Sequence, residues 1–416
     1  MTRLTRLDAS FEHVASTPIA VPTGESGPLV TAPAGPVRGV WRRIVSAPDR
    51  RGGAPRFERS AAFYGIPYAE APSGERRFLA PVPRAPWTAE RPALTPSATP
   101  QRGSIFDDPA IPEPSVPGDD FLTLNVFTPA PGRTGARLPV LVWIHGGGWS
   151  SGSHNSPWYD GAAFNRDGVV TVSIAYRLGF DGYGWVDGSD APFNRAVLDQ
   201  VLALEWVRDN IACFGGDPGE VTIGGQSAGG GNVMVLMTCP RARGLFRRAI
   251  SDSGAVTDFP ADAARSTARE MARLAGVEPN LEGWRALDYD RVFALTAELE
   301  KRRAEQSPRV PLAQRIRAAL VSAPDAGIVY GPAVDGRIVP LPVVEALARG
   351  EGGDVPLLAM STTHEFIGAA FGLVEELGGR TAVEVMEEAG LGAGPAADYV
   401  AAHPELGVTK RSEERR

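Results

Sequence analysis

The 416-residue sequence has little cysteine, little lysine and no long apolar run. Cys213 and Cys239 are its only cysteines, too few for a disulfide framework or a thiolate metal site. Of the 42 basic residues only Lys301 and Lys410 are lysines, which reflects compositional bias rather than function. No apolar run reaches the roughly 18 residues of a membrane span, and the first residues lack the apolar stretch of a secretion signal. We therefore expect a soluble, cytoplasmic protein.

An excess of positive charge is also missing. The formal net charge is -7, which argues against nucleic acid or an anionic membrane surface as the main partner. No histidine pair or Asp/Glu cluster has the spacing of metal ligands, so no metal or organic cofactor is expected. The 43% hydrophobic and 22% charged content is typical of a soluble enzyme with a sizeable core. The oligomeric state stays open.

What the sequence does contain is a series of short apolar runs that alternate with helical segments. Runs of β-branched residues without polar alternation are typical of strands buried on both faces of a parallel sheet. Their alternation with helices predicts an α/β fold, a doubly wound and mostly parallel sheet with helical cap insertions. We expect strands at 138–144, 168–176, 220–225, 247–254 and 355–360, helices from 194 and at 228–238, and cap helices near 262–275 and 311–322.

The stretch "GGQSAGG" places Ser227 between an expected strand and an expected helix. Glycines two residues before and two after a serine, Gly225 and Gly229, leave room for the sharp strand–turn–helix of a nucleophile elbow. An ordinary glycine turn is the alternative interpretation, because the bare pattern is common. The strand and helix context favours a catalytic serine, whose hydroxyl needs a base beside it.

A second glycine cluster, "HGGG" at 145–148, directly follows the expected strand 138–144. Acyl transfer requires hydrogen-bond donors aimed at the developing oxyanion, and glycine allows backbone N–H groups to approach closely. Gly147 and Gly148, together with the N–H of Ala228, are therefore the candidate oxyanion hole. The alternative is a structural turn after a strand. We expect the imidazole of His145 to support the loop rather than to act in catalysis.

These motifs, in this order, resemble the type-B carboxylesterase family, which includes para-nitrobenzyl esterases and cholinesterases. The resemblance implies an α/β-hydrolase fold and a serine carboxylic-ester hydrolase with a Ser–Glu–His triad. It covers about residues 35–404, taken as one domain, with 1–34 as a flexible tail and 405–416 as a polar tail. The other stretches that carry it are "FYGIPYAEAPSGERRF", "DDFLTLNVFTP", "AYRLG", "DQVLALEWVRDNIACFGGDP" and "GPAVDGRIVP".

Two departures from the family pattern bear on chemistry. Thr99 and Phe121 stand where secreted relatives carry a disulfide-bonded cysteine pair, and their joint absence agrees with a reducing compartment. Gln226 stands where the family usually has glutamate before the serine, which removes a charge near the nucleophile.

The orienting carboxylate is expected after the serine, beyond a later strand. Glu365 follows the strand 355–360 and matches the glutamate position of the family, although a glutamate opening a helix is also favoured without catalysis. Asp252 is the second candidate, because some α/β-hydrolases carry the acid after the preceding strand. Ser253 matches a family serine near the triad, and we expect it to support the site by a hydrogen bond.

A histidine placed to act as the catalytic base is missing from the predicted site. Chain order in this fold is serine, acid, histidine, which leaves only His403. His403 lies at the end of an expected helix, where histidine is favoured without any catalytic role. In the family the base follows a further strand, and no such strand is apparent between 366 and 416, so the chain is expected to be C-terminally shortened and to lack the base.

Three functions remain open at this point. The first is a carboxylic-ester hydrolase acting on a small-molecule ester. The second is a non-catalytic or nearly inactive esterase-like fragment or binding module, which the absent base favours. The third is a peptidase or lactonase using the same groups. Trp149, Trp158, Tyr159 and Trp185 fall in loops expected near the mouth of the pocket, although aromatic residues also serve simple packing.

Overall fold

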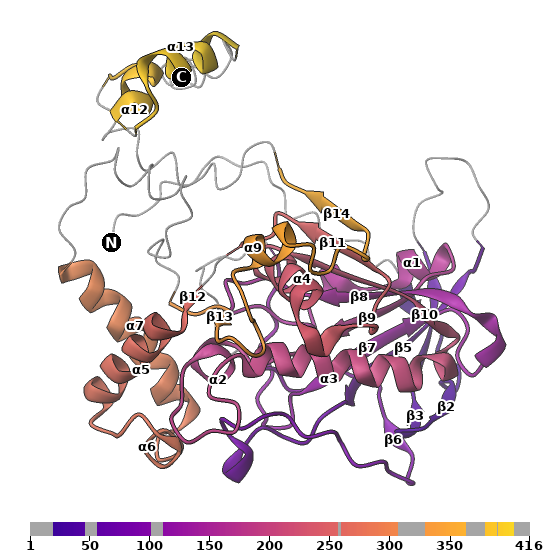
Figure 1. The fold of residues 1–416 in the computed structure, drawn as a ribbon. Helices are drawn as coiled ribbons and strands as arrows, with labels where there is room; N and C mark the ends of the chain where they lie inside the picture. Colours follow the sequence, from indigo (N-terminus) through magenta and orange to yellow (C-terminus); the bar gives the residue numbers. More distant parts are fainter. Residues whose placement is uncertain are drawn as a thin grey trace.

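The computed structural model describes residues 20–45, 56–100, 111–256, 259–306, 329–362, 379–388 and 390–402. A nine-stranded sheet runs through the molecule, with helices packed along it (Figure 1). In spatial order its strands are β1 (Ala20–Pro22), β4 (Val40–Ile44), β5 (Arg59–Pro67), β7 (Thr123–Thr128), β9 (Val170–Ile174), β8 (Leu138–Ile144), β10 (Gly216–Gln226), β11 (Arg248–Asp252) and β14 (Leu357–Met360).

The two halves of this sheet differ in strand direction. Strands β9, β8, β10, β11 and β14 pair in parallel, at the segments where the sequence predicts strands. Strands β1, β4, β5 and β7 pair antiparallel and join the sheet through β9. These four strands interrupt their apolar residues with arginine, asparagine, threonine, glycine or proline, so the search for continuous apolar runs did not predict them. The sheet is therefore mixed.

The expected N-terminal tail, residues 1–34, needs a correction in its second part. Strand β1 belongs to the main sheet, and β2 (Leu29–Ala32) pairs antiparallel with β3 (Gly35–Arg38). The buried side chain of Val30 packs into the core from β2. Proline and glycine signals mark turns, but they do not exclude the short strands between those turns. Residues 20–34 are thus part of the folded unit.

The strands nearest the centre are buried on both faces. All five residues of β9 and all six of β7 are buried, as expected for strands covered on both sides. Strand β14 differs sharply, since all four of its residues are exposed. It forms one edge of the sheet and pairs only with β11 within the described residues.

Helices α3 (Arg195–Asn210) and α4 (Ala228–Thr238) pack on β10, and α4 also contacts β8 and β11. Both were predicted, and α4 has the predicted bounds.

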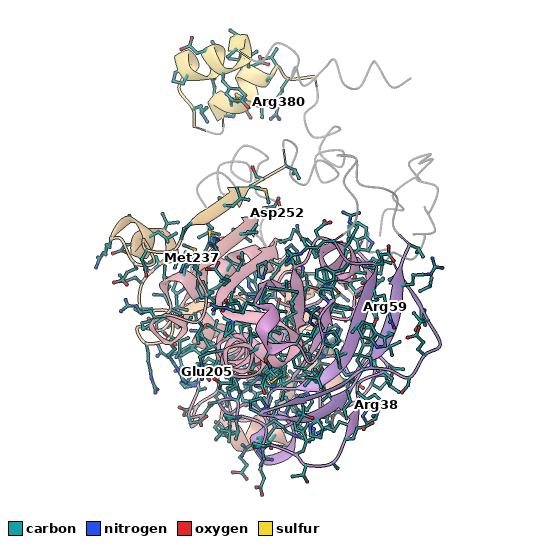
Figure 2. The ribbon with its side chains drawn as sticks, turned by 90° about the vertical axis from the view of Figure 1, so that its right-hand side faces the viewer. Arg38, Arg59, Glu205, Met237, Asp252 and Arg380 are labelled. Atoms are coloured by element: carbon teal, nitrogen blue, oxygen red, sulfur yellow. The ribbon has the colours of Figure 1, made fainter. Side chains whose placement is uncertain are left out.

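The expected cap helix near 262–275 is α5 (Ala261–Ala275), which packs against α7 (Tyr289–Gln306). The cap helix expected near 311–322 lies outside the described residues. Helices α12 (Ala382–Glu388) and α13 (Ala393–Ala402) pack on each other, apart from the sheet in Figures 1 and 2.

The remaining elements are short. The proline-rich segment 80–118 contains one two-residue strand in its described part. The short elements are β6 (Arg91–Pro92), β12 (Phe259–Pro260), β13 (Ala333–Val334), α1 (Ala162–Arg166), α2 (Gly179–Tyr183), α6 (Leu281–Arg285), α9 (Val343–Ala348) and the 3-10 turns at Gly74–Arg76, Thr134–Ala136, Pro157–Tyr159, Ile211–Phe214 and Pro240–Ala242.

The parallel half of the sheet brings several chain segments to one edge. Ile144 at the end of β8 pairs in register with Gly225, and Gln226 at the end of β10 pairs with Asp252. Asp252 in turn pairs with Met360 at the end of β14. The segments that follow these four strands therefore emerge together at the carboxyl edge, where α/β sheets usually bind their ligands.

Candidate functional site

Ser227 lies in the turn between β10 and α4, in a strained backbone conformation. Its φ of 56° and ψ of -125° belong to a region that non-glycine residues rarely adopt, at a cost on the order of 1–3 kcal/mol. Three hydrogen bonds hold it there. Its N–H donates to the carbonyl of Asp252 at 2.9 Å, and its own carbonyl accepts from Gly231 at 2.9 Å and Ala255 at 3.1 Å. Such strain is characteristic of a side chain presented for function.

The glycines around Ser227 make this turn sterically possible. A Cβ at Gly225 would lie 2.5 Å from the backbone carbonyl group of Gly229. A Cβ at Gly229 would lie 2.1 Å from the carbonyl oxygen of Ile144, on the neighbouring strand β8. Strand β10, helix α4 and the end of β8 thus meet backbone to backbone, which is the close approach that the sequence pattern predicts.

The glycine loop at 145–148 lies directly against this elbow. A Cβ on Gly146 would come within 2.7 Å of the Gln226 carbonyl oxygen and 3.2 Å of the Ser227 Cβ. Gly147 and Gly148 have φ values of 118° and 60°, in the region that favours glycine. The loop therefore needs its glycines both for conformation and for contact with the nucleophile turn.

The carbonyl groups of the loop are tied back by the protein. The Gly147 carbonyl accepts from the N–H groups of Ser150 at 3.1 Å and Ser151 at 2.9 Å, and from the Ser151 hydroxyl at 3.1 Å. Within the described part of the chain, the N–H groups of Gly147, Gly148 and Ala228 have no acceptor. An oxyanion hole requires preorganised N–H donors of this kind that are free to bind the substrate.

His145 is buried beneath this loop. It is 1% exposed, and its ring stacks on Tyr176 with the centroids 4.5 Å apart. Its Nδ1 lies 2.8 Å from the Gly146 carbonyl, and the Tyr176 hydroxyl donates to the His145 carbonyl at 2.7 Å. Burial lowers the pKa of His145 to about 4, so the ring is neutral at pH 7. These contacts suit a supporting side chain.

His154 is buried in the same way, and burial followed by the nearby His145 lowers its pKa to about 3. Its Nε2 lies 3.2 Å from the Thr123 hydroxyl oxygen. His13, His364 and His403 lie outside the described residues, as does Glu365. The predicted acid and the one histidine that follows it in the chain therefore remain predictions.

Asp252 and Ser253 follow β11 beside the nucleophile turn, and Figure 2 shows Asp252 close to β14. The Asp252 backbone, through its carbonyl, supports Ser227. Ser253 has a φ of 47°, and its N–H donates to the Met360 carbonyl at 2.7 Å. Both residues thus stand between the nucleophile strand and the strand that precedes Glu365.

The sequence interpretation missed how Trp149 is used. Trp149 is 1% exposed and forms part of the core, whereas Trp158 is 62% exposed. The indole N–H of Trp149 donates to the Asn232 side chain at 3.0 Å, which joins the glycine loop to α4. A polar residue five positions after the serine, inside an otherwise apolar helix, was the one available signal.

In the described ranges, no group of three or more His, Cys, Asp or Glu side chains is placed to hold a metal ion. None of the helices in those ranges is both long enough and apolar enough to span a bilayer.

Comparison with known proteins gives one consistent result. The sequence model of the Carboxylesterase family matches residues 26–389. Para-nitrobenzyl esterase of Bacillus subtilis (strain 168) is 34% identical over 313 residues, covering 72% of this chain and 58% of that protein. Liver carboxylesterase 1 of Mus musculus is 35% identical over 319 residues, covering 74% of this chain and 54% of that protein. The chain spans a little over half the length of these relatives.

Solved structures agree with the sequence comparison. The crystal structure of Geobacillus stearothermophilus carboxylesterase EST55 at pH 6.8 superimposes with a TM-score of 0.64 at 31% identity, covering 91% of this chain and 69% of that one. A thermophilic PNB esterase superimposes with a TM-score of 0.64 at 30% identity, covering 82% of this chain and 64% of that one.

Proposed function

This chain belongs to the carboxylesterase family, and we propose that it hydrolyses small carboxylic esters through an acyl-enzyme on Ser227. The α/β-hydrolase fold expected from the resemblance is confirmed by the carboxylesterase structures that superimpose on it. The observation that carries the proposal is the strained Ser227 turn, packed against Gly146 of the glycine loop at 145–148. Neither strain nor free donors are needed for folding alone.

The chemistry follows from these groups. The Ser227 oxygen attacks the ester carbonyl carbon while a base removes the hydroxyl proton, and the carbonyl oxygen becomes an oxyanion. The N–H groups of Gly147, Gly148 and Ala228 stabilise this charge more than they stabilise the neutral ester. Collapse of the tetrahedral intermediate breaks the bond to the alcohol, which leaves with the proton. Water then releases the acid by the same steps.

Glu365 is the proposed acid of the triad. It follows β14 in the sequence, and the carboxyl end of β14 lies at the same edge of the sheet as the end of β10 that precedes Ser227. A carboxylate in this role orients a histidine and stabilises its protonated form. The base itself is unassigned. His145 and His154 precede the serine and are buried, and His403 is the one histidine after Glu365.

A second candidate function is an esterase-like module that binds esters but turns them over slowly. The observation in its favour is that both histidines in the described ranges are buried, with the His145 ring against the Gly146 carbonyl and the His154 ring against the Thr123 hydroxyl, rather than presented as a base. Without a base, the oxyanion hole and binding still give a rate of roughly 10³–10⁴ over water. A peptidase or lactonase would use the same groups.

Labelling with a fluorophosphonate probe, together with p-nitrophenyl acetate hydrolysis, tests the proposal. We expect the probe to modify one residue, and Ser227→Ala to abolish both labelling and turnover. Ser26→Ala, which changes an exposed serine away from the site, is the matched control and leaves both unchanged. Labelling that persists in the Ser227→Ala variant would overturn the assignment. Parallel assays with a peptide and a lactone separate the related activities.

We also place the protein in the cytoplasm, with a small ester as its partner and with neither nucleic acid nor membrane. Cys213 and Cys239 are free thiols, and Thr99 and Phe121 replace the cysteine pair of secreted relatives. This pattern suits a reducing compartment. Cell fractionation tests the location, and recovery in a secreted fraction would contradict it.

A further inference from the structure

The geometry points to Asn232 as a positioning residue: its side chain clamps the oxyanion loop to the nucleophile helix through the indole of Trp149. The inference rests on the proposed function of Ser227 and deepens it. The oxyanion loop is defined here as residues 145–152, which lead away from β8. Asn232 lies on α4, the helix that begins with Ala228.

The backbone of Trp149 has a strained conformation that contacts with neighbouring residues must stabilise. Its φ of 59° follows the positive φ values of Gly147 and Gly148, so three consecutive residues are in the left-handed region. A non-glycine residue there costs on the order of 1–2 kcal/mol relative to ordinary backbone. The backbone of Trp149 is held on one side, because its carbonyl accepts from the Gly179 N–H at 2.7 Å.

The indole of Trp149 is held on the other side by Asn232. The Trp149 Nε1 donates to the Asn232 Oδ1 at 3.0 Å, and the Tyr183 hydroxyl lies 3.3 Å from the same oxygen. Because an indole N–H can only donate, the oxygen of the amide must face Trp149. The orientation of the amide is thus fixed by its neighbours.

Burial of the Asn232 amide also costs free energy of folding, so a contribution to stability alone does not explain why asparagine stands at this position. Asn232 is fully buried, and its Nδ2 has no hydrogen-bond partner among the residues that the structure describes. A buried polar group without a partner costs about 1–3 kcal/mol. A leucine would fill similar space without that penalty, so the oxygen facing Trp149 is the feature that distinguishes asparagine here.

Helix α4 is also shaped to receive the ring. A Cβ at Gly231 would lie 3.3 Å from Cζ2 of Trp149 and 2.1 Å from the Ala255 carbonyl oxygen. The indole therefore packs where α4 carries no side chain. The loop with Gly147 and Gly148 and the helix with Ala228 are joined at this point, so the Trp149–Asn232 bond sets the spacing between the donors that both supply.

This arrangement predicts a loss that falls on turnover rather than on substrate binding. A ground-state ester needs the donors little, whereas the oxyanion needs them at hydrogen-bond distance. Loosening the clamp displaces the donors without removing them. We therefore expect kcat to fall about 10- to 100-fold with KM within about threefold, less than the loss from deleting a donor outright.

The test uses Trp149→Phe, which removes the N–H and keeps a ring, Asn232→Leu, which removes the acceptor, and the double variant. The matched control is Trp206→Phe: Trp206 is buried on α3, and its indole N–H has no partner in the described ranges, so the same substitution breaks no hydrogen bond seen there. Two measurements are made on each variant: kcat and KM for p-nitrophenyl acetate, and amide hydrogen exchange of residues 145–152.

Both single variants should lower kcat as stated and speed exchange of the oxyanion loop at least about tenfold, with the double variant no worse than either single one. Trp206→Phe should change neither. The inference is overturned if loop exchange in Trp149→Phe and Asn232→Leu matches the parent, or if Trp206→Phe has the same effect. If the parent protein hydrolyses no ester, the proposed function fails, and loop exchange still decides whether the clamp exists.

Discussion

The carboxyl ends of β10 and β14 lie at the same edge of one sheet, yet they differ in how firmly the chain fixes them. Around β10, backbone atoms of three elements meet so closely that a methyl group at Gly229 would lie 2.1 Å from a carbonyl oxygen. Strand β14 has open sides, with Leu357, Leu358 and Met360 exposed by 37%, 54% and 44%. The first end carries the serine and the second precedes the proposed acid.

This difference separates two kinds of catalytic group. The nucleophile and its oxyanion loop are positioned by short-range sterics, which a few glycines encode locally. The acid and the base must be delivered to Ser227 by segments distant in the chain, whose placement depends on how the rest of the fold packs. A local motif therefore identifies the first kind and only narrows the choice for the second.

The largest expected effect concerns the acid. Glu365→Gln should lower kcat for p-nitrophenyl acetate by about 10²–10⁴-fold with little change in KM, because an orienting carboxylate is lost while the serine and its donors stay in place. Asp252→Asn should change kcat less than about threefold, since Asp252 supports Ser227 through its backbone carbonyl, which the substitution keeps. If Asp252→Asn is crippling and Glu365→Gln is mild, the acid follows β11 instead.

The close packing at the carboxyl end of β10 can be tested by a stability measurement. Gly229→Ala places a methyl group against the Ile144 carbonyl, so strand, loop and helix must separate, at a cost of about 1–3 kcal/mol of unfolding free energy. Gly135→Ala is the matched control, because a Cβ at Gly135 meets nothing within 4 Å. Urea denaturation of both variants gives the comparison. Equal free energies of unfolding would mean that the turn at Ser227 accommodates the added methyl group at little cost.

The sequence predicted the locally encoded parts of this structure better than the parts that depend on contacts between distant segments of the chain. The strands and helix around Ser227 were predicted within a few residues, since each is a continuous apolar or glycine-rich segment. Strand β4 was missed because its sequence, "VWRRI", shows neither a continuous apolar run nor a strict alternation of apolar and polar residues. Its Arg42 is buried by pairing with Asp160, 118 residues away in the chain, and no local pattern encodes that contact. The Trp149–Asn232 hydrogen bond joins residues 83 positions apart, so its partner could not be predicted locally, although a polar residue in an apolar helix marked Asn232 itself.

A smaller effect is expected from pH. His154 has a folded-state pKa of about 3, well below the ordinary 6.5, because burial and then the nearby His145 disfavour its charged form. The unfolded chain therefore binds the proton first, and stability that is complete above pH 6.5 is lost as the pH falls toward 3.

For this one group the loss between pH 7 and pH 5 is about 2 kcal/mol. His154→Gln should remove it, so the variant loses about 2 kcal/mol less than the parent over that interval. Urea denaturation of both proteins at the two pH values measures the difference. Parallel pH curves for parent and variant would show that His154 is accessible to protons in the native state.

The smallest effect should come from the open strand, and it bears most directly on the contrast between the two ends. Leu358→Ala removes a side chain that is already 54% exposed on β14, so we expect a loss below about 1 kcal/mol in the free energy of unfolding. The identical substitution at Leu124, fully buried on β7, should cost about 2–5 kcal/mol, because it also leaves a cavity. Denaturation of the two variants under one condition compares them. A large loss at Leu358 would mean that another surface covers β14 in solution, and the acid side of the site would then be as firmly built as the serine side.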